Sequence, residues 1–474
     1  MKTITVMDPV TRIEGHMKVE IAIDTNGGQQ QIVNAHCTGT LFRGFENLLN
    51  GRSPLDAPII TQRICGVCPI SHGQAAVQAL ENVSNWLPPT NARLLRNLTL
   101  GANFLQSHIL HFYLLAALDY VAGPAASPWA TAWQTDMRPG LDSVAANLPA
   151  AIGARRQAHE MGAVFAGRMP STNSYIPGGF TAIPTASDIS RYKQHLAELT
   201  QFINKVYLPD VQQVGDVYSD YFKVGRGSGN LLAYGAFEMD DTNSSRLFSG
   251  GYAESGAENI QDSVNTNDIT ESVKYSWYAD ATGSLTPASG ETRPEFPKEG
   301  AYSWLKAPRL KDKPYEAGPL ARMWINGDYS RGISVMDRHV ARALEAKKIA
   351  AAMGGWLDEL NSGQNGFDEN YEQFSGFGVA LTEAPRGALG HWVEITQGKI
   401  SHYQVITPTC WNASPRDNND VGGPMETALI GTPIENPDEP VEALRVIHAY
   451  DPCLSCAVHI LRPDKKPIVV HTGK

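Results

Sequence analysis

The stretch Arg63-Ile64-Cys65-Gly66-Val67-Cys68-Pro69-Ile70-Ser71-His72 carries two cysteines separated by two residues. A second pair of the same spacing stands near the other end of the chain, in Asp451-Pro452-Cys453-Leu454-Ser455-Cys456-Ala457-Val458-His459. Two intervening residues bring the chain back by about one turn, so both sulfurs of a pair can reach one metal ion. If the two pairs meet at one metal, nearly the whole chain must close into a single unit.

A helix is predicted to begin at or just after each cysteine pair. Apolar residues recur at helical spacing after the first pair, at Ala75, Ala76, Ala79, Leu80 and Val83. This pattern predicts a helix that begins near His72 and ends before Leu87-Pro88-Pro89. Asp451-Pro452 is typical of a helix start, with Asp451 as the N-cap and Pro452 at the first helical position. A helix N-terminus favours the thiolate form of a cysteine, so both pairs are suited to bind metal.

The remaining chain is predicted to be mainly helical, with a small N-terminal β-sheet. Residues 17–23 alternate apolar and charged side chains, and a β-type pattern resumes at 31–35 after Asn26-Gly27, which predicts a hairpin. Helical patterns cover residues 91–121, 148–168, 186–218 and 337–360, whereas the polar segments 239–300 and 361–372 are predicted to be irregular. We therefore expect an α+β fold in one catalytic domain, residues 1–474.

Net charge, apolar stretches and the number of cysteines limit which partners and which kinds of site this chain is expected to have. The formal net charge of −10 gives no reason to expect nucleic acid or an anionic membrane as a partner. The apolar stretch 99–121 is interrupted by Gln106, Ser107 and two histidines, which favours a buried helix over a membrane span. The first residues, MKTITV, show no secretory signal. Six cysteines in 474 residues indicate metal binding rather than a disulfide framework.

Two kinds of metal site fit the cysteine spacing. A structural zinc site of four cysteines is the simpler interpretation. Structural zinc sites, however, usually take ligands that are close in sequence, whereas these pairs stand near opposite ends of the chain. Arg63 and His72 beside the first pair, and Asp451 and His459 beside the second, are also residues that a closed zinc site does not need. These two points favour a reactive metal centre.

The complete motifs Arg-x-Cys-Gly-x-Cys-x-x-x-His and Asp-Pro-Cys-x-x-Cys-x-x-His resemble the paired signatures of nickel–iron hydrogenase large subunits. The resemblance extends over essentially the whole chain and includes residues 8–16 (DPVTRIEGH), 41–46 (LFRGFE) and 383–387 (EAPRG). The length and the segment 106–113 (QSHILHFY) look closest to the nickel–iron–selenium branch. Members of that branch carry selenocysteine at the position of Cys453, so this chain would be a cysteine-containing relative.

The resemblance implies a metal centre and a set of residues around it. Nickel would be bound by Cys65, Cys68, Cys453 and Cys456, and Cys68 and Cys456 would bridge to an iron that carries carbonyl and cyanide ligands. A separate magnesium ion, or iron or calcium in its place, would be bound by Glu46 and His459. Cys37 and Cys410 match no ligand position and are interpreted as small buried apolar residues.

Other residues receive roles from the same resemblance. Glu14 would carry protons away from the metals, with Cys453 as the nearest base on nickel. Arg386, next to Pro385, would place its guanidinium over the metals and bind one cyanide, and Thr409 would donate to the other. His72 would hydrogen-bond a bridging sulfur. Each of these residues also has an ordinary structural interpretation: a surface carboxylate, a salt-bridging arginine, a strand-end hydroxyl and a packed histidine. For Asp451 the cap role is compatible with a role at the cofactor.

Two features depart from the pattern of the family. Ser107 stands where many members outside the selenium branch place an aspartate over the metals. Residues 460–474 follow His459, whereas in the family the peptide after this histidine is removed by a maturation endopeptidase once nickel is bound. Residues 460–474 are therefore expected to be a propeptide.

The implied function is reversible oxidation of H2 to protons and electrons. Because four cysteines belong to the metal centre, the electrons must leave through a small subunit that carries iron–sulfur clusters, toward an acceptor such as a cytochrome c. The expected location is the periplasm, with export alongside that subunit and membrane association; the cytoplasm is the alternative. Two other functions stay open at this point: an H2-sensing regulatory protein, and a relative of the quinone-site subunit of respiratory complex I.

Overall fold

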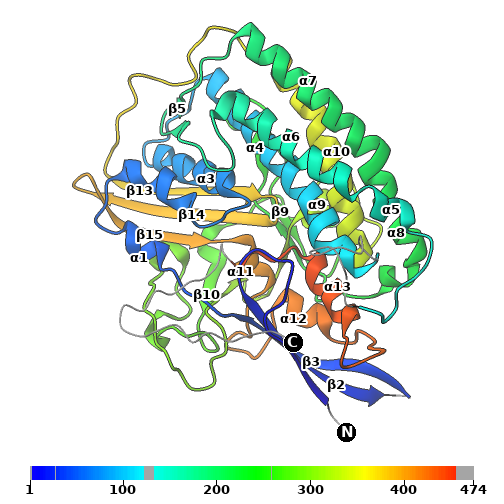
Figure 1. Cartoon of the computed structure of the whole chain (residues 1–474). Helices are drawn as coiled ribbons and strands as arrows, with labels where there is room; N and C mark the ends of the chain where they lie inside the picture. Colours follow the sequence, from blue (N-terminus) through cyan, green and yellow to red (C-terminus); the bar gives the residue numbers. More distant parts are fainter. Residues whose placement is uncertain (1–2, 27, 122–132, 258, 455–474) are drawn as a thin grey trace, which may run out of the picture.

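The computed structural model of the chain describes residues 3–26, 28–121, 133–257 and 259–454 (Figure 1). Helices gather on one side of the molecule, and the largest sheets lie on the other side and at the N-terminal end (Figure 1). In this part of the chain, no helix is both long enough and apolar enough to cross a membrane. The predicted α+β architecture is therefore correct in outline.

The helical side is built around one almost completely buried helix, α4, which packs against α6 and α10, and α7 packs against both of these (Figure 1). The helices are α1 (Phe45–Leu49), α2 (Ala57–Thr61), α3 (Pro69–Asn82), α4 (Thr90–Leu110), α5 (Asp142–Ala146), α6 (Leu148–Ala166), α7 (Ala186–Phe202), α8 (Leu208–Val217), α9 (Pro319–Ile325), α10 (Val335–Glu359), α11 (Pro408–Asn412), α12 (Pro424–Leu429) and α13 (Val441–Ala449).

Two of the predicted long helices change character within their length. The helix predicted over residues 91–121 is α-helical only to Leu110 and then continues as a π-helical turn, His111–Ala116, and a 3-10 turn, Ala117–Asp119. The helix predicted over 186–218 contains a π-helical turn, Ile203–Tyr207, between α7 and α8. Pro209 follows this second turn and has no N–H to continue the α-helical hydrogen bonds, which accounts for the local change.

The structure contains more sheets than the single N-terminal sheet that the sequence predicts. The predicted hairpin is present as β2 and β3 in the antiparallel sheet β1-β2-β3, and a second antiparallel sheet, β13-β14-β15, was not predicted. The strands are β1 (Thr3–Met7), β2 (Met17–Asn26), β3 (Gln29–Gly39), β4 (Tyr175–Ile176), β5 (Gly179–Phe180), β6 (Leu231–Ala233), β7 (Ala236–Glu238), β8 (Arg246–Phe248), β9 (Gly251–Ala253), β10 (Ile269–Ser272), β11 (Ala307–Leu310), β12 (Glu316–Ala317), β13 (Gly376–Ala384), β14 (Gly387–Thr396) and β15 (Lys399–Ile406).

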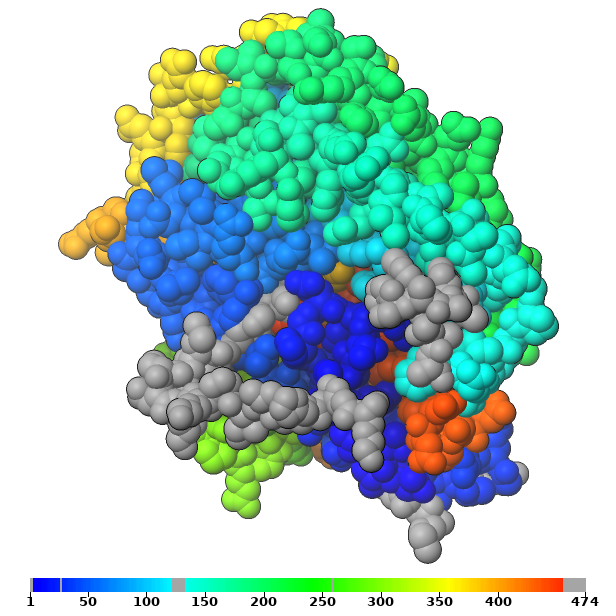
Figure 2. All heavy atoms as spheres, in the orientation of Figure 1, coloured from blue at the N-terminus to red at the C-terminus, as the bar shows by residue number. Residues whose placement is uncertain are grey.

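The central strand β14 is buried on both faces, and α3 covers one of these faces. Its residues therefore show no clear alternation of apolar and polar side chains. That burial removes the two-residue periodicity by which a strand is recognised in sequence. The segment 239–300 agrees better with its prediction, since it contains only short strands and turns among its described residues. In the space-filling view, N-terminal residues in dark blue fill the middle of one face, between the segments around α3 and α13 (Figure 2).

A candidate metal centre

Three cysteine side chains from the two ends of the chain meet in the interior. Cys65, Cys68 and Cys453 are each at most 2% exposed. The Sγ atom of Cys65 lies 2.8 Å from that of Cys68 and 3.3 Å from that of Cys453. All three sulfur atoms lie within 4.8 Å of one another, close enough for one metal ion to reach all of them. Cys456 and His459, the remaining predicted ligands near the C-terminus, lie outside the described residues.

Helix α3 presents the first cysteine pair. Cys68 is the N-cap residue of α3 and Pro69 is its first residue, so the helix begins three residues earlier than predicted and His72 lies inside it. The backbone N–H groups of Val67 and Cys68 both point to the sulfur of Cys65, at 3.4 and 3.1 Å. These donors and the positive end of the helix dipole stabilise negative charge on the sulfur.

Cys453 is held in place from two directions. Its backbone N–H donates to the hydroxyl of Thr409 at 3.0 Å, and the next N–H, of Leu454, donates to the carbonyl of Glu14 at 2.7 Å. Residues 14 and 453 therefore form a parallel β-bridge between the two ends of the chain. The hydroxyl oxygen of Thr409 accepts this hydrogen bond from Cys453. Its O–H proton is not used in that bond, so the predicted donation to a cofactor ligand is compatible with it.

Glu14 lies against the loop that contains the first cysteine pair. A Cβ built on Gly66 would stand 3.1 Å from Oε1 of Glu14. The carboxyl group thus occupies the space that the missing side chain of Gly66 leaves, between Cys65 and Cys68 in sequence. Glu14 as a whole is partly buried.

Arg386 reaches toward the cysteines from the turn between β13 and β14, where it follows Pro385. The side chain is buried, its Nε donates to the backbone carbonyl of Asp451 at 3.1 Å, and Nη2 lies 3.0 Å from Oδ1 of the same residue. Burial opposes the charged form, but Asp451 and the three thiols together raise the pKa of the Arg386 guanidinium well above its usual value. Arg386 is therefore a fixed positive charge beside the sulfurs.

Asp451 lies directly after α13, in the left-handed region of backbone space at a φ of 54°, and its N–H closes the helix on the carbonyl of His448. Its side chain faces Arg386. The predicted N-cap role is wrong: an N-cap at Asp451 would accept from the N–H of Cys453 or Leu454, but these groups donate to Thr409 and Glu14.

His72 belongs to a short row of buried polar rings. Its Nδ1 is 3.2 Å from Nε2 of His391, whose own Nδ1 is 2.8 Å from the hydroxyl of Tyr403. Burial lowers the pKa of His72 to about 4 and that of His391 well below its usual value, so both rings are neutral near pH 7. No sequence motif indicated His391 or Tyr403, because both stand in the unpredicted sheet β13-β14-β15.

Glu46 lies in α1 and already has protein partners: the N–H of Val405 donates to Oε1 at 3.0 Å, and the hydroxyl of Thr292 donates to Oε2. Lys306 adds a positive charge in its neighbourhood. Among the described residues, Glu46 belongs to no group of three or more histidine, cysteine or carboxylate side chains close enough to bind one metal ion. Its predicted co-ligand, His459, falls outside them.

Several buried hydrogen-bond donors around the three sulfurs lack an acceptor, and a metal that carries non-protein ligands could supply one. Nε2 of His72 and both Nη atoms of Arg386 are buried and have no hydrogen-bond partner of good geometry among the described residues. Buried donors are nearly always satisfied in native proteins. Three soft sulfur ligands suit nickel and iron, and these spare donors fit acceptor groups bound to such a metal. The other cysteines, Cys37 and Cys410, are buried away from this group, as predicted.

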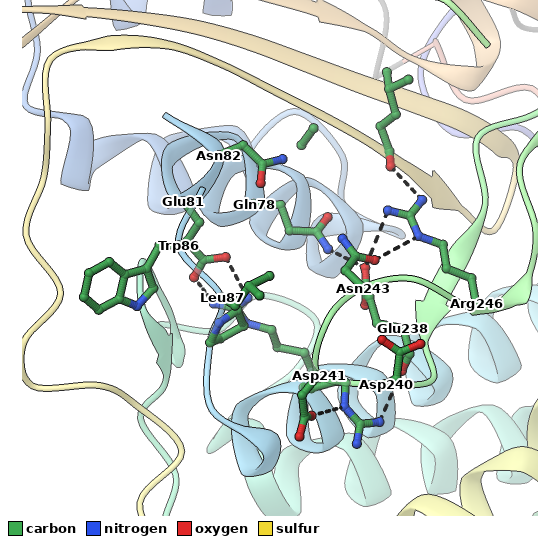
Figure 3. Close-up of a pocket in the computed structure, with 15 residues that line it drawn as sticks. Gln78, Glu81, Asn82, Trp86, Leu87, Glu238, Asp240, Asp241, Asn243 and Arg246 are labelled. Atoms are coloured by element: carbon green, nitrogen blue, oxygen red, sulfur yellow. Dashed lines mark hydrogen bonds and ion pairs between the residues drawn. The ribbon is translucent and has the colours of Figure 1, made fainter. Parts of the chain in front are cut away.

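The pocket in Figure 3 lies elsewhere, between the C-terminal end of α3, the start of α4 and the segment around β7 and β8, and has a volume of about 60 Å³. Glu81 on its wall is roughly 20 Å along α3 from Cys68. Its charged side chains bind one another; Arg96, for example, makes two hydrogen bonds to Glu81. We therefore place the chemistry at the cysteines and not in this pocket.

The chain is similar to known nickel-dependent hydrogenases. The sequence model of the nickel-dependent hydrogenase family matches residues 43–136 and 129–459, and a HoxL-like model matches residues 3–33. The periplasmic [NiFeSe] hydrogenase large subunit of Desulfomicrobium baculatum is 40% identical over 97% of this chain and 95% of its own. The hydrogenase-2 large chain of Escherichia coli K12 is 30% identical over 98% of both.

Solved structures give the same answer for the fold. The reduced Ni-Fe-Se hydrogenase from D. vulgaris Hildenborough superimposes with a TM-score of 0.92 at 40% identity, over 97% of this chain and all of that one. A reduced, active Ni-Fe-Se hydrogenase from Desulfomicrobium baculatum gives a TM-score of 0.91 at 39% identity, over 96% of this chain.

Proposed function

The chain belongs to the nickel-dependent hydrogenase family, as a large subunit that acts on H2, and on this premise we propose that Cys65, Cys68, Cys453 and Cys456 hold a nickel–iron centre for reversible H2 oxidation. The observation that carries the proposal is the buried group of three sulfurs assembled from both ends of the chain. Cys456, three positions after Cys453, is the proposed fourth ligand. The centre supplies Lewis-acid chemistry that polarises H2 toward heterolytic cleavage.

The residues around the sulfurs divide the remaining work. Arg386, with Pro385 beside it, and Thr409 are proposed to orient the carbonyl and cyanide ligands of the iron through their spare donors. His72 is proposed to donate from Nε2 to a bridging sulfur, because its neutral ring has one N–H to give. Asp451 is proposed to fix the guanidinium of Arg386. Fixed donors of this kind need no reorganisation during the reaction.

Proton release is proposed to run from the sulfur of Cys453 to Glu14. The carboxyl group of Glu14 lies over Gly66 in the cysteine loop, and its backbone pairs with the chain at Cys453 and Leu454. Glu14 as a whole is partly buried, and its carboxylate is proposed to accept a proton from the side of the sulfurs and pass it on toward water. No other carboxyl group among the described residues is placed against this loop in the same way.

The magnesium site and the tail form one linked proposal. Glu46 and His459 would bind magnesium, or iron or calcium in its place, within a single catalytic domain. Residues 460–474 include Arg462, Asp464, Lys465 and Lys466, which could not be buried beside such a site without unpaired charge. An endopeptidase is therefore proposed to cut after His459. The mass of the active enzyme tests this: a fully active protein that retains residues 460–474 would exclude it.

Electron transfer requires another chain. Cys37 and Cys410 are buried apart from the metal centre, so the described residues contain no second group of cysteines for an iron–sulfur cluster. The large-subunit names of the relatives imply a heterodimer with a small subunit, which would carry the clusters and pass electrons to an acceptor such as a cytochrome c. The name of a periplasmic relative supports the proposed periplasmic location. Export alongside the small subunit and membrane association stay predictions.

The two alternative functions have less support. A relative of the complex I quinone-site subunit would not need the three sulfurs that converge here. An H2 sensor would keep the metal centre but would turn over slowly and would lack a removable tail, whereas residues 460–474 follow His459 in this chain. Turnover of the purified heterodimer separates a sensor from a catalytic subunit.

The deciding experiment is elemental analysis and infrared spectroscopy of the purified heterodimer. We expect nickel and iron, together with bands from carbonyl and cyanide. Cys65→Ser should abolish metal binding, because a neutral hydroxyl cannot replace a thiolate. Cys37→Ala is the matched control, since Cys37 is equally buried but lies outside the sulfur group, and it should keep both metals. Zinc alone, without the infrared bands, would refute the proposed function.

A further inference from the structure

Arg322 is a fully buried arginine that the proposed function leaves without a role. It lies in α9, is 0% exposed, and all five of its N–H groups find acceptors. Nε and Nη2 donate to the two carboxyl oxygens of Glu345 at 2.5 and 2.8 Å, and Nη1 donates to Oε2 of Glu383 at 2.6 Å. Two buried carboxylates therefore hold the guanidinium rigidly in one plane.

The two remaining N–H groups of Arg322 bind the turn that carries Arg386. Nη1 donates to the carbonyl of Ala384 at 3.1 Å and Nη2 to the carbonyl of Pro385 at 2.9 Å. Ala384 is the last residue of β13 and pairs with Gly387 at the start of β14. Pro385 and Arg386 form the two-residue connection between them, so Arg322 binds the two carbonyls immediately before Arg386.

Close backbone packing brings α9 and this turn together. A Cβ on Gly387 would stand 2.7 Å from the carbonyl carbon of Ala317, and one on Gly318 would stand 3.1 Å from the carbonyl oxygen of Arg386. Both glycines have positive φ angles, 138° and 144°. These two glycines therefore let the start of α9 contact the turn directly, and Arg322 reaches the carbonyls from one helical turn further along.

We propose that Arg322 is a positioning residue for the metal centre, which fixes the direction of Arg386 by binding both carbonyls of residues 384 and 385. The proposal rests on the proposed function, because it concerns the cofactor ligands to which Arg386 donates. The carbonyl bonds set the plane of the peptide before Arg386, and Asp451 holds the other end of its side chain. Only an arginine offers a fork that can bind two carboxylates and two carbonyls together.

The chain offers a matched control in Arg96, which has the same type of environment far from the cysteines. Arg96 is 2% exposed, makes two hydrogen bonds to Glu81, and donates to the carbonyls of Ile176 and Gly179 at 3.1 and 2.8 Å. It belongs to the wall of the separate pocket beside Glu81 (Figure 3). Arg322→Lys and Arg96→Lys each remove bonds from a buried guanidinium to a carboxylate and to two backbone carbonyls, although Arg96 binds one carboxylate where Arg322 binds two.

The test compares these two variants as purified, metal-loaded heterodimers by infrared spectroscopy, H2-oxidation kinetics and thermal unfolding. We expect both to unfold at lower temperature. Arg322→Lys alone should shift the cyanide bands and lower kcat by roughly tenfold to a hundredfold, with a smaller change in KM, because the donor over the metals is misplaced. Bands and kcat that stay unchanged in Arg322→Lys, or that change equally in Arg96→Lys, would overturn the proposal.

A second variant covers the case in which Arg322→Lys does not accumulate. Glu383→Gln keeps Arg322 and the side-chain shape, but removes the charge from a carboxyl group that binds both Arg322 and the N–H of Tyr234. We expect a shift of the cyanide bands in loaded Glu383→Gln, and unshifted bands would equally overturn the inference. Wild-type protein without any such bands would refute the proposed function itself, which is a different outcome.

Discussion

Oε1 of Glu14 lies 3.1 Å from the point at which a Cβ on Gly66 would stand. The proposed proton carrier is therefore packed directly on the backbone of the loop that presents Cys65 and Cys68. Gly66 lies outside the left-handed region, so its backbone would accept alanine without strain. The glycine is needed for the space it leaves, and this makes the position of Glu14 testable without changing Glu14.

Gly66→Ala should displace the carboxyl group of Glu14 by a few tenths of an ångström, because a contact of 3.1 Å is too short for a methyl group. We expect turnover to fall measurably, but by less than about tenfold, while nickel and iron stay bound. Metal analysis beside H2-oxidation assays measures both quantities. Full activity in this variant would show that the contact between Glu14 and the loop does not matter for turnover.

Glu14→Gln tests the proton carrier itself. The amide keeps the shape and the hydrogen-bonding capacity of the side chain but cannot carry a proton at neutral pH, so H2 oxidation should fall by about a hundredfold or more. The infrared bands of the centre should stay as in wild type. Glu20→Gln, at a partly exposed carboxylate of β2, is the control and should be fully active. An active Glu14→Gln enzyme would remove Glu14 from the mechanism.

Thr409→Val tests how Cys453 is held. Valine has a similar shape but no oxygen, so the buried N–H of Cys453 would lose its acceptor at a cost of about 1–3 kcal/mol. We expect lower metal occupancy and a lower unfolding temperature. Thr409→Ser keeps the hydroxyl and should preserve both properties. If valine proved as good as serine, the hydrogen bond would have no part in placing Cys453.

Sequence reasoning predicted that Cys65, Cys68 and Cys453 would meet because these residues stand in two short motifs. Cys65, Cys68 and His72 are fixed by one local element, the start of α3, and Arg386 and Asp451 also stand within contiguous motifs. The supporting residues could not be found in this way. His391 supports His72 from a strand that lacks a two-residue periodicity, and it is linked to its partner only by the tertiary fold.

Arg322 shows the same limit more clearly. Its partners Glu345, Glu383 and Pro385 come from α10, β13 and the turn that follows β13, and nothing in the local sequence distinguishes it from a surface arginine. The predicted helix over residues 91–121 was too long for a related reason. Residues 112–116 (FYLLA) are apolar and contain no proline or glycine, so the sequence pattern marked no helix end at Leu110, where the π-helical turn begins.

The last prediction concerns acid stability and the buried ring of His339. This residue of α10 is 1% exposed, and neither ring nitrogen has a hydrogen-bond partner among the described residues. It stacks on His111 with ring centroids 5.6 Å apart. Burial, and next the charge of Arg342, lower the pKa of His339 to about 3, so the folded protein keeps this ring neutral.

The sign of the effect follows from proton binding in the two states. Between pH 6.5 and about 3 the unfolded chain binds a proton at residue 339 and the folded chain does not, so the free energy of unfolding decreases as the pH falls through this window. The full effect of one such group on the free energy of unfolding is about 5 kcal/mol.

His339→Phe keeps an aromatic ring against His111 and cannot titrate. The difference in unfolding temperature between pH 7 and pH 5 should therefore be smaller in His339→Phe than in wild type, whereas His195→Asn, at a partly exposed position in α7, should leave it unchanged. An undiminished acid sensitivity in His339→Phe would show that the folded state accommodates the protonated ring.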